Sequence, residues 1–308
     1  MTDCLADETI AAWADNALLP DERERAIEHV ASCEVCRAVV GHLMMTSVHA
    51  PTPAKIGRYE IRGALGAGGM GVVLRGHDPV LGREVAIKMI KSTLVEPAHR
   101  HRMLREARAI AKVRHPNVVS VHELGEAGDE LYVAMELVAG TMLQRWLGTP
   151  RPVEQRIALV LAIGRGLAAV HAAELLHRDI KPDNIVVRDD GTPVLVDFGL
   201  ARDTAVPAFG AGSGIAGTPR YLAPEVASGR AATAASDQYQ WWTIVEDALP
   251  DLRAVRPLVE RGHDPDPARR FASMRDAVAA LERAVATRPP RARWIVAGLG
   301  VLAVAGAI

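Results

Sequence analysis

The spacing of hydrophobic and polar residues changes along the chain and divides it into segments. Helix-forming residues with acids near their start, in "LPDERERAIEHVASCEVCRAVVGHLM", predict a small helical unit over residues 1–45. A polar stretch with prolines then predicts a linker over residues 46–57. From Tyr59 the short β-like runs "RYEIRGAL", "GVVLRGHD" and "REVAIKMI" alternate with Gly and Asp, which predicts an antiparallel meander.

Beyond this meander the pattern becomes mainly helical. A helical period over Ala98–Val113 is followed by two more strand-like runs, and the helical segments after Thr141 are interrupted by "NIVVRDDGTPVLVDF". Strands that come first and helices that come later predict an α+β protein in two lobes. We expect this two-lobed domain over residues 58–285.

Composition narrows the class of protein without naming a function. The chain has 308 residues, of which 49% are hydrophobic and 24% charged, as in an ordinary globular protein. A net charge of −1 without a basic run gives no reason to expect a nucleic-acid partner. The acidic first residues lack the apolar core of a secretory signal, so we expect the protein in the cytoplasm.

Three glycines in the first strand pair follow the spacing G-x-G-x-x-G. They are Gly66, Gly68 and Gly71 in "LGAGGMGVV", and glycine lets the backbone approach phosphate oxygens closely. A dinucleotide-binding loop would need a helix after the glycines. A strand follows here instead, and the next strand carries Lys88 in "VAIK", so the dinucleotide alternative fails.

Three more motifs follow in order along the chain. "HRDIKPDN" covers His177–Asn184, "DFG" covers Asp197–Gly199 and "APE" covers Ala223–Glu225. With the glycine loop and Lys88, these motifs resemble those of the eukaryotic-type serine/threonine protein kinases that also occur in bacteria, over about Tyr59–Leu281. The resemblance implies the two-lobed kinase fold, with ATP and Mg²⁺ as cofactors and protein substrates.

The same resemblance implies a role for each matching residue. Asp179 would accept the proton of the substrate hydroxyl, and Lys181 would lie near the γ-phosphate. Asn184 and Asp197 would hold Mg²⁺ through the hard oxygen ligands that this cation prefers. The expected ATP-binding residues are Leu65, Gly66, Gly68, Gly71, Val73, Ala86, Lys88, Glu106, Met135, Glu136 and Val138.

Glu106 and the segment after Asp197 refine this expectation. Glu106 in "RMLREARAI" is the expected partner of Lys88, the alternative being a surface acid among arginines. The lysine in "HRDIKPDN" resembles serine/threonine kinases rather than tyrosine kinases, and Arg178 in that motif could pair with an activation-loop phosphate. The candidate phosphorylation sites are Thr204, Ser213 and Thr218, unless the segment is only a flexible loop.

The stretch "ASDQYQWWTIVEDALPD" marks where the sequence departs from the kinase pattern. Asp237 matches the aspartate that begins the family's helix F and holds the catalytic loop, and Arg270 is placed to pair with Glu225. The family's helix G has no counterpart, so we expect a C-lobe that is shortened after helix F. Trp242 stands where relatives have a small residue. The Trp241–Trp242 pair either fills the gap left by the missing helix or packs as an ordinary core pair.

The three cysteines favour metal or thiol chemistry over a disulfide framework. His29, Cys33 and Cys36 lie on one face of the predicted helix, and Cys4 would complete a closed tetrahedral set for Zn²⁺. The pattern resembles the zinc-binding domains of the anti-sigma-factor type, so we expect a structural or regulatory unit that binds a protein partner. A redox-active C-x-x-C pair and buried apolar cysteines are the alternatives.

An uninterrupted apolar run closes the sequence. Trp294–Ile308 comprises 15 apolar residues and follows an arginine-containing stretch over residues 286–293. The run is shorter than the roughly 20 residues of a full membrane span. We expect a membrane anchor, either short or incomplete in this sequence, with the kinase on its cytoplasmic side. The alternatives are a core helix and a soluble cytoplasmic protein.

These features leave a second function open beside the enzyme. Trp242 and the absent helix G favour a nucleotide-binding signalling scaffold that acts through the zinc-binding unit. The intact Lys88, Asp179, Asn184 and Asp197 favour a kinase. Phosphate transfer to an added protein, or nucleotide binding without transfer, distinguishes the two.

Overall fold

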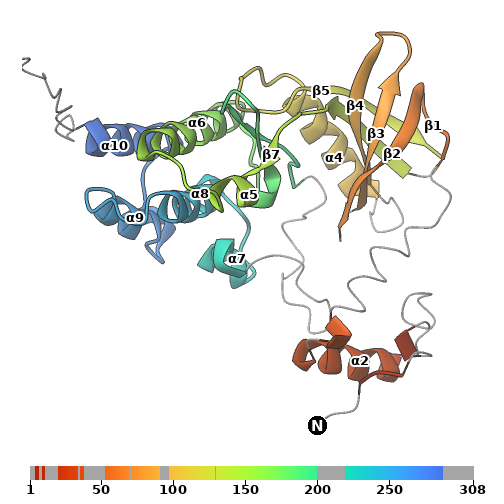
Figure 1. The fold of residues 1–308 in the computed structure, drawn as a ribbon, viewed down its shortest axis with the longest axis horizontal. Helices are drawn as coiled ribbons and strands as arrows, with labels where there is room; N and C mark the ends of the chain where they lie inside the picture. The colour runs from red at the N-terminus through yellow and green to blue at the C-terminus, as the bar shows by residue number, and fades with distance from the viewer. Residues whose placement is uncertain are drawn as a thin grey trace, which may run out of the picture.

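A computed structural model gives the fold, and its arrangement is shown in Figure 1. The structure describes residues 4–6, 9–10, 20–33, 35–37, 53–68, 71–90, 97–128, 130–199 and 219–286. Near the N-terminus, α2 (Pro20–Ser32) lies within the expected helical unit. The remaining described residues form a lobe built on a β-sheet and a helical lobe, as expected from the order of strands and helices.

The smaller lobe is a six-stranded antiparallel sheet in the order β1-β2-β3-β4-β6-β5, accompanied by one helix. Its elements are β1 (Lys55–Ile56), β2 (Tyr59–Gly68), β3 (Gly71–Asp78), β4 (Arg83–Ile90), α4 (Pro97–Ile110), β5 (Val121–Ala127) and β6 (Glu130–Glu136). The glycine-rich pair β2–β3 places Gly66 opposite Val73. Val73 in turn lies opposite Lys88 on β4, so the glycine loop and the lysine occupy neighbouring strands.

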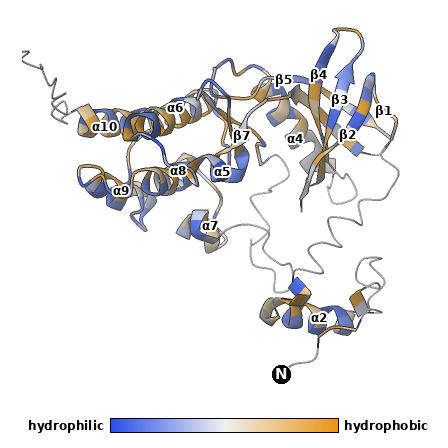
Figure 2. Ribbon diagram, viewed as in Figure 1, coloured by the Kyte–Doolittle hydropathy of each residue, from blue (hydrophilic) through white to orange (hydrophobic). Residues whose placement is uncertain are grey.

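The larger lobe is mainly helical. Its elements are β7 (Thr141–Met142), α5 (Leu143–Leu147), α6 (Val153–Ala172), the 3-10 turn η2 (Pro182–Asn184), β8 (Ile185–Val187), β9 (Pro193–Leu195), the 3-10 turn η3 (Pro219–Tyr221), α7 (Pro224–Ala227), α8 (Ala234–Ala248), α9 (Arg256–Gly262), the 3-10 turn η4 (Pro267–Arg269) and α10 (Met274–Ala286). Both α8 and α10 pack on α6, and hydrophobic residues are distributed along these helices in Figure 2. The apolar residues of α6 therefore lie at the centre of the lobe.

The connection from α8 to α9 shows that the larger lobe is shortened. The first turn of α8 is closed by a capping box between Thr233 and Ser236, and the helix ends at Ala248. Only the irregular segment 249–255 separates Ala248 from Arg256, the first residue of α9. Within the described residues no further helix lies between them, as the missing helix G predicted.

The two adjacent tryptophans belong to the core of this lobe. Trp241 and Trp242 are both 0% exposed. The Trp241 indole nitrogen donates a hydrogen bond of 3.0 Å to the Val160 carbonyl oxygen on α6. Trp242 stacks on Phe271, and its ring lies so close to Gly262 that any Cβ at position 262 would overlap it. Both rings therefore belong to the core, and Gly262 provides the space for the second ring.

The expected membrane segment is not visible in this fold. None of the helices that the structure describes combines the length and the apolar character that a bilayer crossing requires. Trp294–Ile308 and the stretch 287–293 before it lie outside the described residues. The expected anchor therefore stays a prediction.

Candidate active site

Side chains of α8 hold the backbone of the loop that carries the catalytic motif. The carboxylate of Asp237 accepts hydrogen bonds from the backbone nitrogens of His177 and Arg178, at 2.9 and 2.8 Å. Gln240, one turn further along the same helix face, accepts a bond of 2.9 Å from the Ile180 backbone nitrogen. The predicted role of Asp237 is confirmed by these contacts. Gln240 was not predicted, although its i, i+3 spacing from Asp237 could have revealed it.

His177 ties the catalytic loop to the DFG motif. Its side chain is fully buried, packs on the Phe198 ring at 4.6 Å and lies 3.2 Å from the Val196 carbonyl oxygen through Nε2. Burial lowers the pKa of His177, although nearby carboxylates, led by Asp237, act in the opposite direction. The imidazole is therefore neutral near pH 7, and it supports the loop by packing rather than through a charge.

Asp179 lies within a cluster of its predicted partners. The Asn184 amide nitrogen donates to the backbone oxygen of Asp179 at 2.8 Å and to its carboxylate at 2.9 Å. The Lys181 ammonium lies 3.0 Å from the same carboxylate. These contacts fix the orientation of Asp179 and place a positive charge beside it. All three residues predicted to be catalytic are thus brought together.

Lys88 and Asp197 join the two lobes across the cleft. Lys88 is 5% exposed and forms an ion pair with the Asp197 carboxylate. The Val196 backbone nitrogen donates a hydrogen bond of 2.9 Å to the Asn184 carbonyl oxygen. This bond attaches the residue before Asp197 to the cluster around Asp179. Asp197 has φ of 59° and Arg178 has φ of 66°. Non-glycine residues rarely adopt this left-handed conformation, and it is concentrated at functional sites.

The structure does not form the expected ion pair between Lys88 and Glu106. Both guanidinium amino groups of Arg178 donate to the Glu106 carboxylate instead, at 2.7 and 2.8 Å. The expectation for this pair was therefore wrong in this state of the molecule. The physical reason is that a bidentate arginine fork engages both carboxylate oxygens, while Lys88 has found a second acid in Asp197.

The remaining residues predicted to bind ATP lie on or just after neighbouring strands of the smaller lobe. Gly66, Gly68 and Leu65 lie on β2, and Gly71 and Val73 lie on β3. Leu65 is 49% exposed. The others lie on or just after two further strands: Ala86 on β4, Met135 and Glu136 on β6, and Val138 after it.

Met135 and Glu136 stand at the connection between the lobes. Met135 lines a cavity of about 20 Å³ together with Lys88, Asp197 and Phe198, so it forms the inner wall beside the ion pair. The Glu136 side chain pairs with Arg188, the residue that follows β8 in the larger lobe. This pair connects the two lobes at the hinge, and no sequence motif predicted it.

The residues expected to hold Mg²⁺ have a suitable donor set. The amide nitrogen of Asn184 is engaged twice with Asp179, which leaves the amide oxygen as the atom that can face a cation. Asp197 supplies a carboxylate from the neighbouring segment. Hard oxygen ligands of this kind, few in number, match the way Mg²⁺ is held together with phosphate groups.

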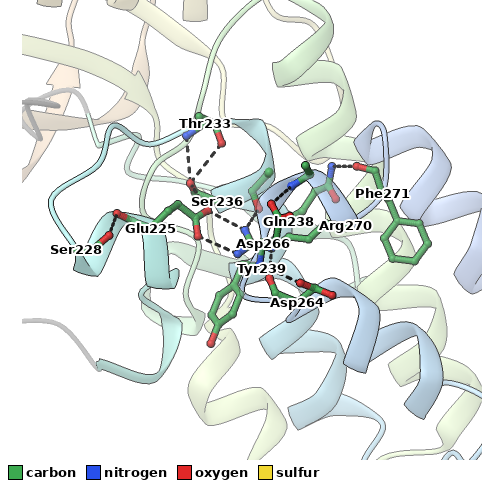
Figure 3. A network of polar contacts seen from close by, with 12 residues as sticks. Glu225, Ser228, Thr233, Ser236, Gln238, Tyr239, Asp264, Asp266, Arg270 and Phe271 are labelled. Atoms are coloured by element: carbon green, nitrogen blue, oxygen red, sulfur yellow. Dashed lines mark hydrogen bonds and ion pairs between the residues drawn. The ribbon is translucent and has the colours of Figure 1, made fainter.

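A buried ion pair joins α7 to the residue that follows η4 (Figure 3). Arg270 donates through both terminal nitrogens to the Glu225 carboxylate, at 2.7 and 2.8 Å, and Ser236 donates to Glu225 at 2.8 Å. The predicted contact between Arg270 and Glu225 is confirmed. Burial would raise the pKa of Glu225. The hydrogen bonds from Arg270 and Ser236, together with the positive charge of Arg270, outweigh burial and lower this pKa.

The cysteines form a second cluster near the N-terminus. The sulfur atoms of Cys4, Cys33 and Cys36 all lie within 4.8 Å of one another. Nε2 of His29 lies 3.3 Å from Cys36 Sγ, so the histidine joins the same group. The separation of 4.0 Å between Cys4 Sγ and Cys33 Sγ is close to the roughly 3.8 Å edge of a tetrahedron with Zn–S bonds of about 2.3 Å.

Two of these thiols differ in their affinity for a proton. A hydrogen bond from the Cys36 backbone lowers the pKa of Cys33 to about 7. A hydrogen bond with the Cys36 thiol and the neighbouring Cys33 raise the pKa of Cys4 to about 11. A divalent cation would favour the thiolate at both positions, because only thiolates are good ligands for zinc.

Three predicted residues cannot be placed. The candidate phosphorylation sites Thr204, Ser213 and Thr218 lie outside the described residues. In η3, which follows Thr218, Tyr221 donates a hydrogen bond of 2.6 Å to Asp247 near the end of α8. The end of this segment is thus attached to the same helix that supports the catalytic loop.

Comparison with known proteins places this geometry in a family. Residues 59–245 match the protein kinase domain family, and residues 6–37 match a family described as "Putative zinc-finger". The second match covers His29, Cys33 and Cys36 but begins after Cys4. The first match ends within α8, just before the connection in which helix G is missing.

Individual relatives agree with the family match. The chain is 34% identical to the serine/threonine-protein kinase PknE of Mycobacterium tuberculosis over 266 residues, covering 76% of this chain and 47% of PknE. It is 36% identical to PknA of the same organism over 275 residues, covering 76% of this chain and 63% of PknA. The chain thus spans about half the length of PknE and less than two thirds of PknA.

A solved structure shows the same fold. The crystal structure of the Mycobacterium tuberculosis PknI kinase domain superposes with a TM-score of 0.61 at 26% identity, covering 75% of this chain and 97% of that one. The predicted α+β kinase fold is therefore confirmed. With its family match over more than half of its length and relatives above 30% identity, the chain belongs to the protein kinase family.

Proposed function

We propose that this chain is a serine/threonine protein kinase that transfers the γ-phosphate of ATP to hydroxyl groups of protein substrates. One observation carries the proposal: Asp179 is held by Lys181 and Asn184 on one side of the cleft. Lys88 and Asp197 pair across the same cleft. This is the set of charges that a reaction dominated by positioning and electrostatic stabilisation requires.

The residues divide the reaction between them. Asp179 accepts the proton of the attacking hydroxyl while the new bond between its oxygen and the γ-phosphorus forms and the bond to the leaving ADP breaks. Lys181 and Lys88 stabilise negative charge on the γ-phosphate and on the α/β-phosphates. Asn184 and Asp197 would hold Mg²⁺, which neutralises phosphate charge when it is bound.

The test is transfer of labelled phosphate by the full chain, with Mg²⁺ and a generic basic protein as acceptor. We expect label on serine or threonine, and its loss in Asp179→Asn. Asp183→Asn is the matched control, because Asp183 lies in the same loop but is exposed. Equal transfer by the wild type and Asp179→Asn would contradict the proposed mechanism.

A second function is favoured by the direct connection from α8 to α9. Without helix G the larger lobe has lost a docking surface, and a nucleotide-binding signalling scaffold would not need one. Binding of Mg²⁺ and ATP with no transfer to any acceptor, or to the chain itself, would support the scaffold. Transfer to an added protein would exclude it.

The N-terminal unit is proposed to bind Zn²⁺ through Cys4, His29, Cys33 and Cys36 and to recruit a protein partner. The proximity of the three sulfur atoms supports this set. Metal analysis of the purified chain should give one zinc per chain. Cys36→Ser should remove it, because Cys36 is the buried thiol of the set. An unchanged zinc content in this variant would exclude the ligand set.

The apolar run 294–308 is proposed to anchor the kinase to the membrane, with the kinase domain on the cytoplasmic side. Its uniform apolar character and the preceding arginines support this role. The full chain should sediment with membranes, and a chain truncated after Arg293 should not. Equal distribution of both chains would favour the alternative of a soluble cytoplasmic protein.

A further inference from the structure

A buried glutamine of α8, Gln240, contacts the backbone directly after Asp179. The Ile180 backbone nitrogen donates to the Gln240 amide oxygen at 2.9 Å. Both residues are buried, so water has little access to either group. A buried backbone donor that loses its acceptor destabilises the arrangement around it, because no water replaces the lost bond. The position of this stretch of backbone therefore depends on Gln240.

The peptide unit between Asp179 and Ile180 is held at both of its polar atoms. Its nitrogen donates to Gln240, and its carbonyl oxygen accepts a bond of 2.8 Å from the Asn184 side-chain amide. Because the peptide unit is planar, bonds on its two opposite edges fix the orientation of the plane. This orientation constrains ψ of Asp179 and thereby the direction of the carboxylate that leaves the same Cα atom.

The residue before Asp179 explains why a second anchor is needed. Arg178 has φ of 66°, a left-handed conformation that costs free energy in a non-glycine residue and persists only where neighbouring contacts hold it. Asp237 holds the backbone nitrogens of His177 and Arg178, on the N-terminal side of Asp179. Gln240 holds the backbone on the C-terminal side. Without this second anchor the strained backbone would relax through the peptide unit that carries Asp179.

Gln240 supplies its acceptor without adding a charge. The carboxylates of Asp179 and Asp237 already lie beside this loop, and the Lys181 ammonium lies 3.0 Å from the first of them. An acid at position 240 would bury a further negative charge close to both, at a large cost in desolvation. A neutral amide oxygen binds the Ile180 nitrogen without that cost.

We propose that Gln240 is a positioning residue for the proposed phosphate transfer. Its amide oxygen fixes the backbone that follows Asp179 and so keeps the carboxylate directed at the acceptor hydroxyl. Gln240 touches neither substrate nor nucleotide in this role and acts through Asp179. The inference rests on the proposed function, because it concerns the base of that reaction.

This role predicts a separation of kcat from KM. The expected ATP contacts lie on strands of the smaller lobe, whereas Gln240 lies on α8 of the larger lobe. Loss of the amide oxygen should therefore leave the KM for ATP within about twofold of the wild-type value. A base that is misplaced by about 1 Å should lower kcat about tenfold to a hundredfold. A glutamine that only stabilised the fold would leave kcat of the folded molecules unchanged.

The chain offers a matched control two residues away. Gln238 lies on the same helix, is also buried, and donates a hydrogen bond of 3.0 Å from its amide nitrogen to the Phe271 carbonyl oxygen. Phe271 follows η4 and lies outside the catalytic loop. Gln238→Leu therefore removes a buried amide and a bond to the backbone, as Gln240→Leu does, but at a place that does not hold Asp179.

The experiment compares wild type, Gln240→Leu and Gln238→Leu as full chains. Transfer of labelled phosphate to a generic basic protein gives kcat and the KM for ATP, at a temperature where thermal unfolding shows all three to be folded. Hydrogen–deuterium exchange, followed by mass spectrometry, reports on the Ile180 amide without any need for activity. If Gln240→Leu does not fold, Gln240→Met takes its place, because its unbranched side chain follows a similar path.

We expect only the substitution at position 240 to lower kcat about tenfold or more and to accelerate exchange at Ile180. Equal kcat values for Gln240→Leu and Gln238→Leu, or a change in the KM for ATP that exceeds the change in kcat, would overturn the positioning role. Unchanged exchange at Ile180 in Gln240→Leu would also overturn it. Absence of transfer by all three proteins, with exchange at Ile180 accelerated only in Gln240→Leu, would instead overturn the proposed function and leave the anchor established.

Discussion

Two glutamate–arginine pairs of nearly identical geometry lie in different parts of this molecule. In the larger lobe Glu225 and Arg270 are joined at 2.7 and 2.8 Å, with side chains 3% and 0% exposed. Between the lobes Glu106 and Arg178 are joined at the same two distances, with side chains 20% and 15% exposed. The two pairs join the same charged groups, but their side chains differ in exposed fraction and in neighbouring contacts.

The surroundings determine how far each pair is enclosed. Arg270 also donates to the Ala235 and Asp264 carbonyl oxygens, and Ser236 completes the shell of Glu225 (Figure 3). Both residues belong to one lobe, and no other charge competes for them in these contacts. Glu106 and Arg178 belong to different lobes, on α4 and in the catalytic loop. One pair is therefore enclosed within a single lobe, and the other joins the two lobes.

The largest expected effect is that of breaking the structural pair. Arg270→Ala leaves the Glu225 carboxylate buried without its partner, which should lower the free energy of unfolding by about 3–5 kcal/mol. Urea denaturation followed by tryptophan fluorescence measures it. Arg269→Ala is the matched control, because Arg269 is 74% exposed in its side chain and should change stability by less than about 0.5 kcal/mol. Similar effects of both would contradict the distinction.

Acid should weaken the structural pair without any substitution. The pKa of Glu225 is lowered from its ordinary value of 4.5, so its contribution is fully present above that pH. Stability should then decrease as the pH falls below 4.5 towards the lowered folded-state pKa. Denaturation of wild type and Glu225→Gln on either side of pH 4.5 measures this difference. A parallel loss in both proteins would assign the acid sensitivity to other groups.

A substitution that adds a methyl group in the same lobe tests the effect of packing on stability without changing any charge. Gly262→Ala should cost about 1–3 kcal/mol, because its Cβ would overlap the buried Trp242 ring. The loss should be smaller in the background of Trp242→Leu, which removes the ring. Gly148→Ala is the control, since a Cβ there meets only ordinary contacts, the nearest at 3.4 Å. Thermal denaturation of these variants provides the comparison, and additive effects would argue against the contact.

The smallest effect on stability is expected at the Glu106–Arg178 pair between the lobes. Glu106→Gln should lower the free energy of unfolding by only about 1 kcal/mol, because the amide keeps part of the hydrogen bonding and the lobes fold without the pair. Urea denaturation, as for Arg270→Ala, measures this difference. A stability loss as large as that of Arg270→Ala would show that both pairs are structural.

The sequence predicted the fold because its signals are local and ordered. Glycine spacing on one hairpin, Lys88 on the next strand and the HRD and DFG motifs each constrain a short segment, and their order defines the lobes. Asp237 and Arg270 were found through the same order. Gln240 escaped notice, although a helix face that already presents Asp237 to the catalytic loop must present position 240 as well.

The partner of Glu106 could not have been predicted in this way. Glu106 and Arg178 are separated by 72 positions, and their contact depends on how α4 lies against the larger lobe. Sequence patterns show which residues can form ion pairs, but several cations were available to one acid. The choice among Lys88, Arg178 and solvent is a balance of small free energies over the whole site.

The close fit of Trp242 against Gly262 also has a bearing on ancestry. A lineage that acquired the tryptophan first would have placed an indole on top of a side chain, whereas a glycine acquired first would have left only a cavity. The tolerable order of events is therefore glycine and then tryptophan. Once both residues were present, changing either one alone would lower the stability of the fold, so the pair would be retained. Positions 242 and 262 therefore behave as one unit of packing, in which a change at one requires a change at the other.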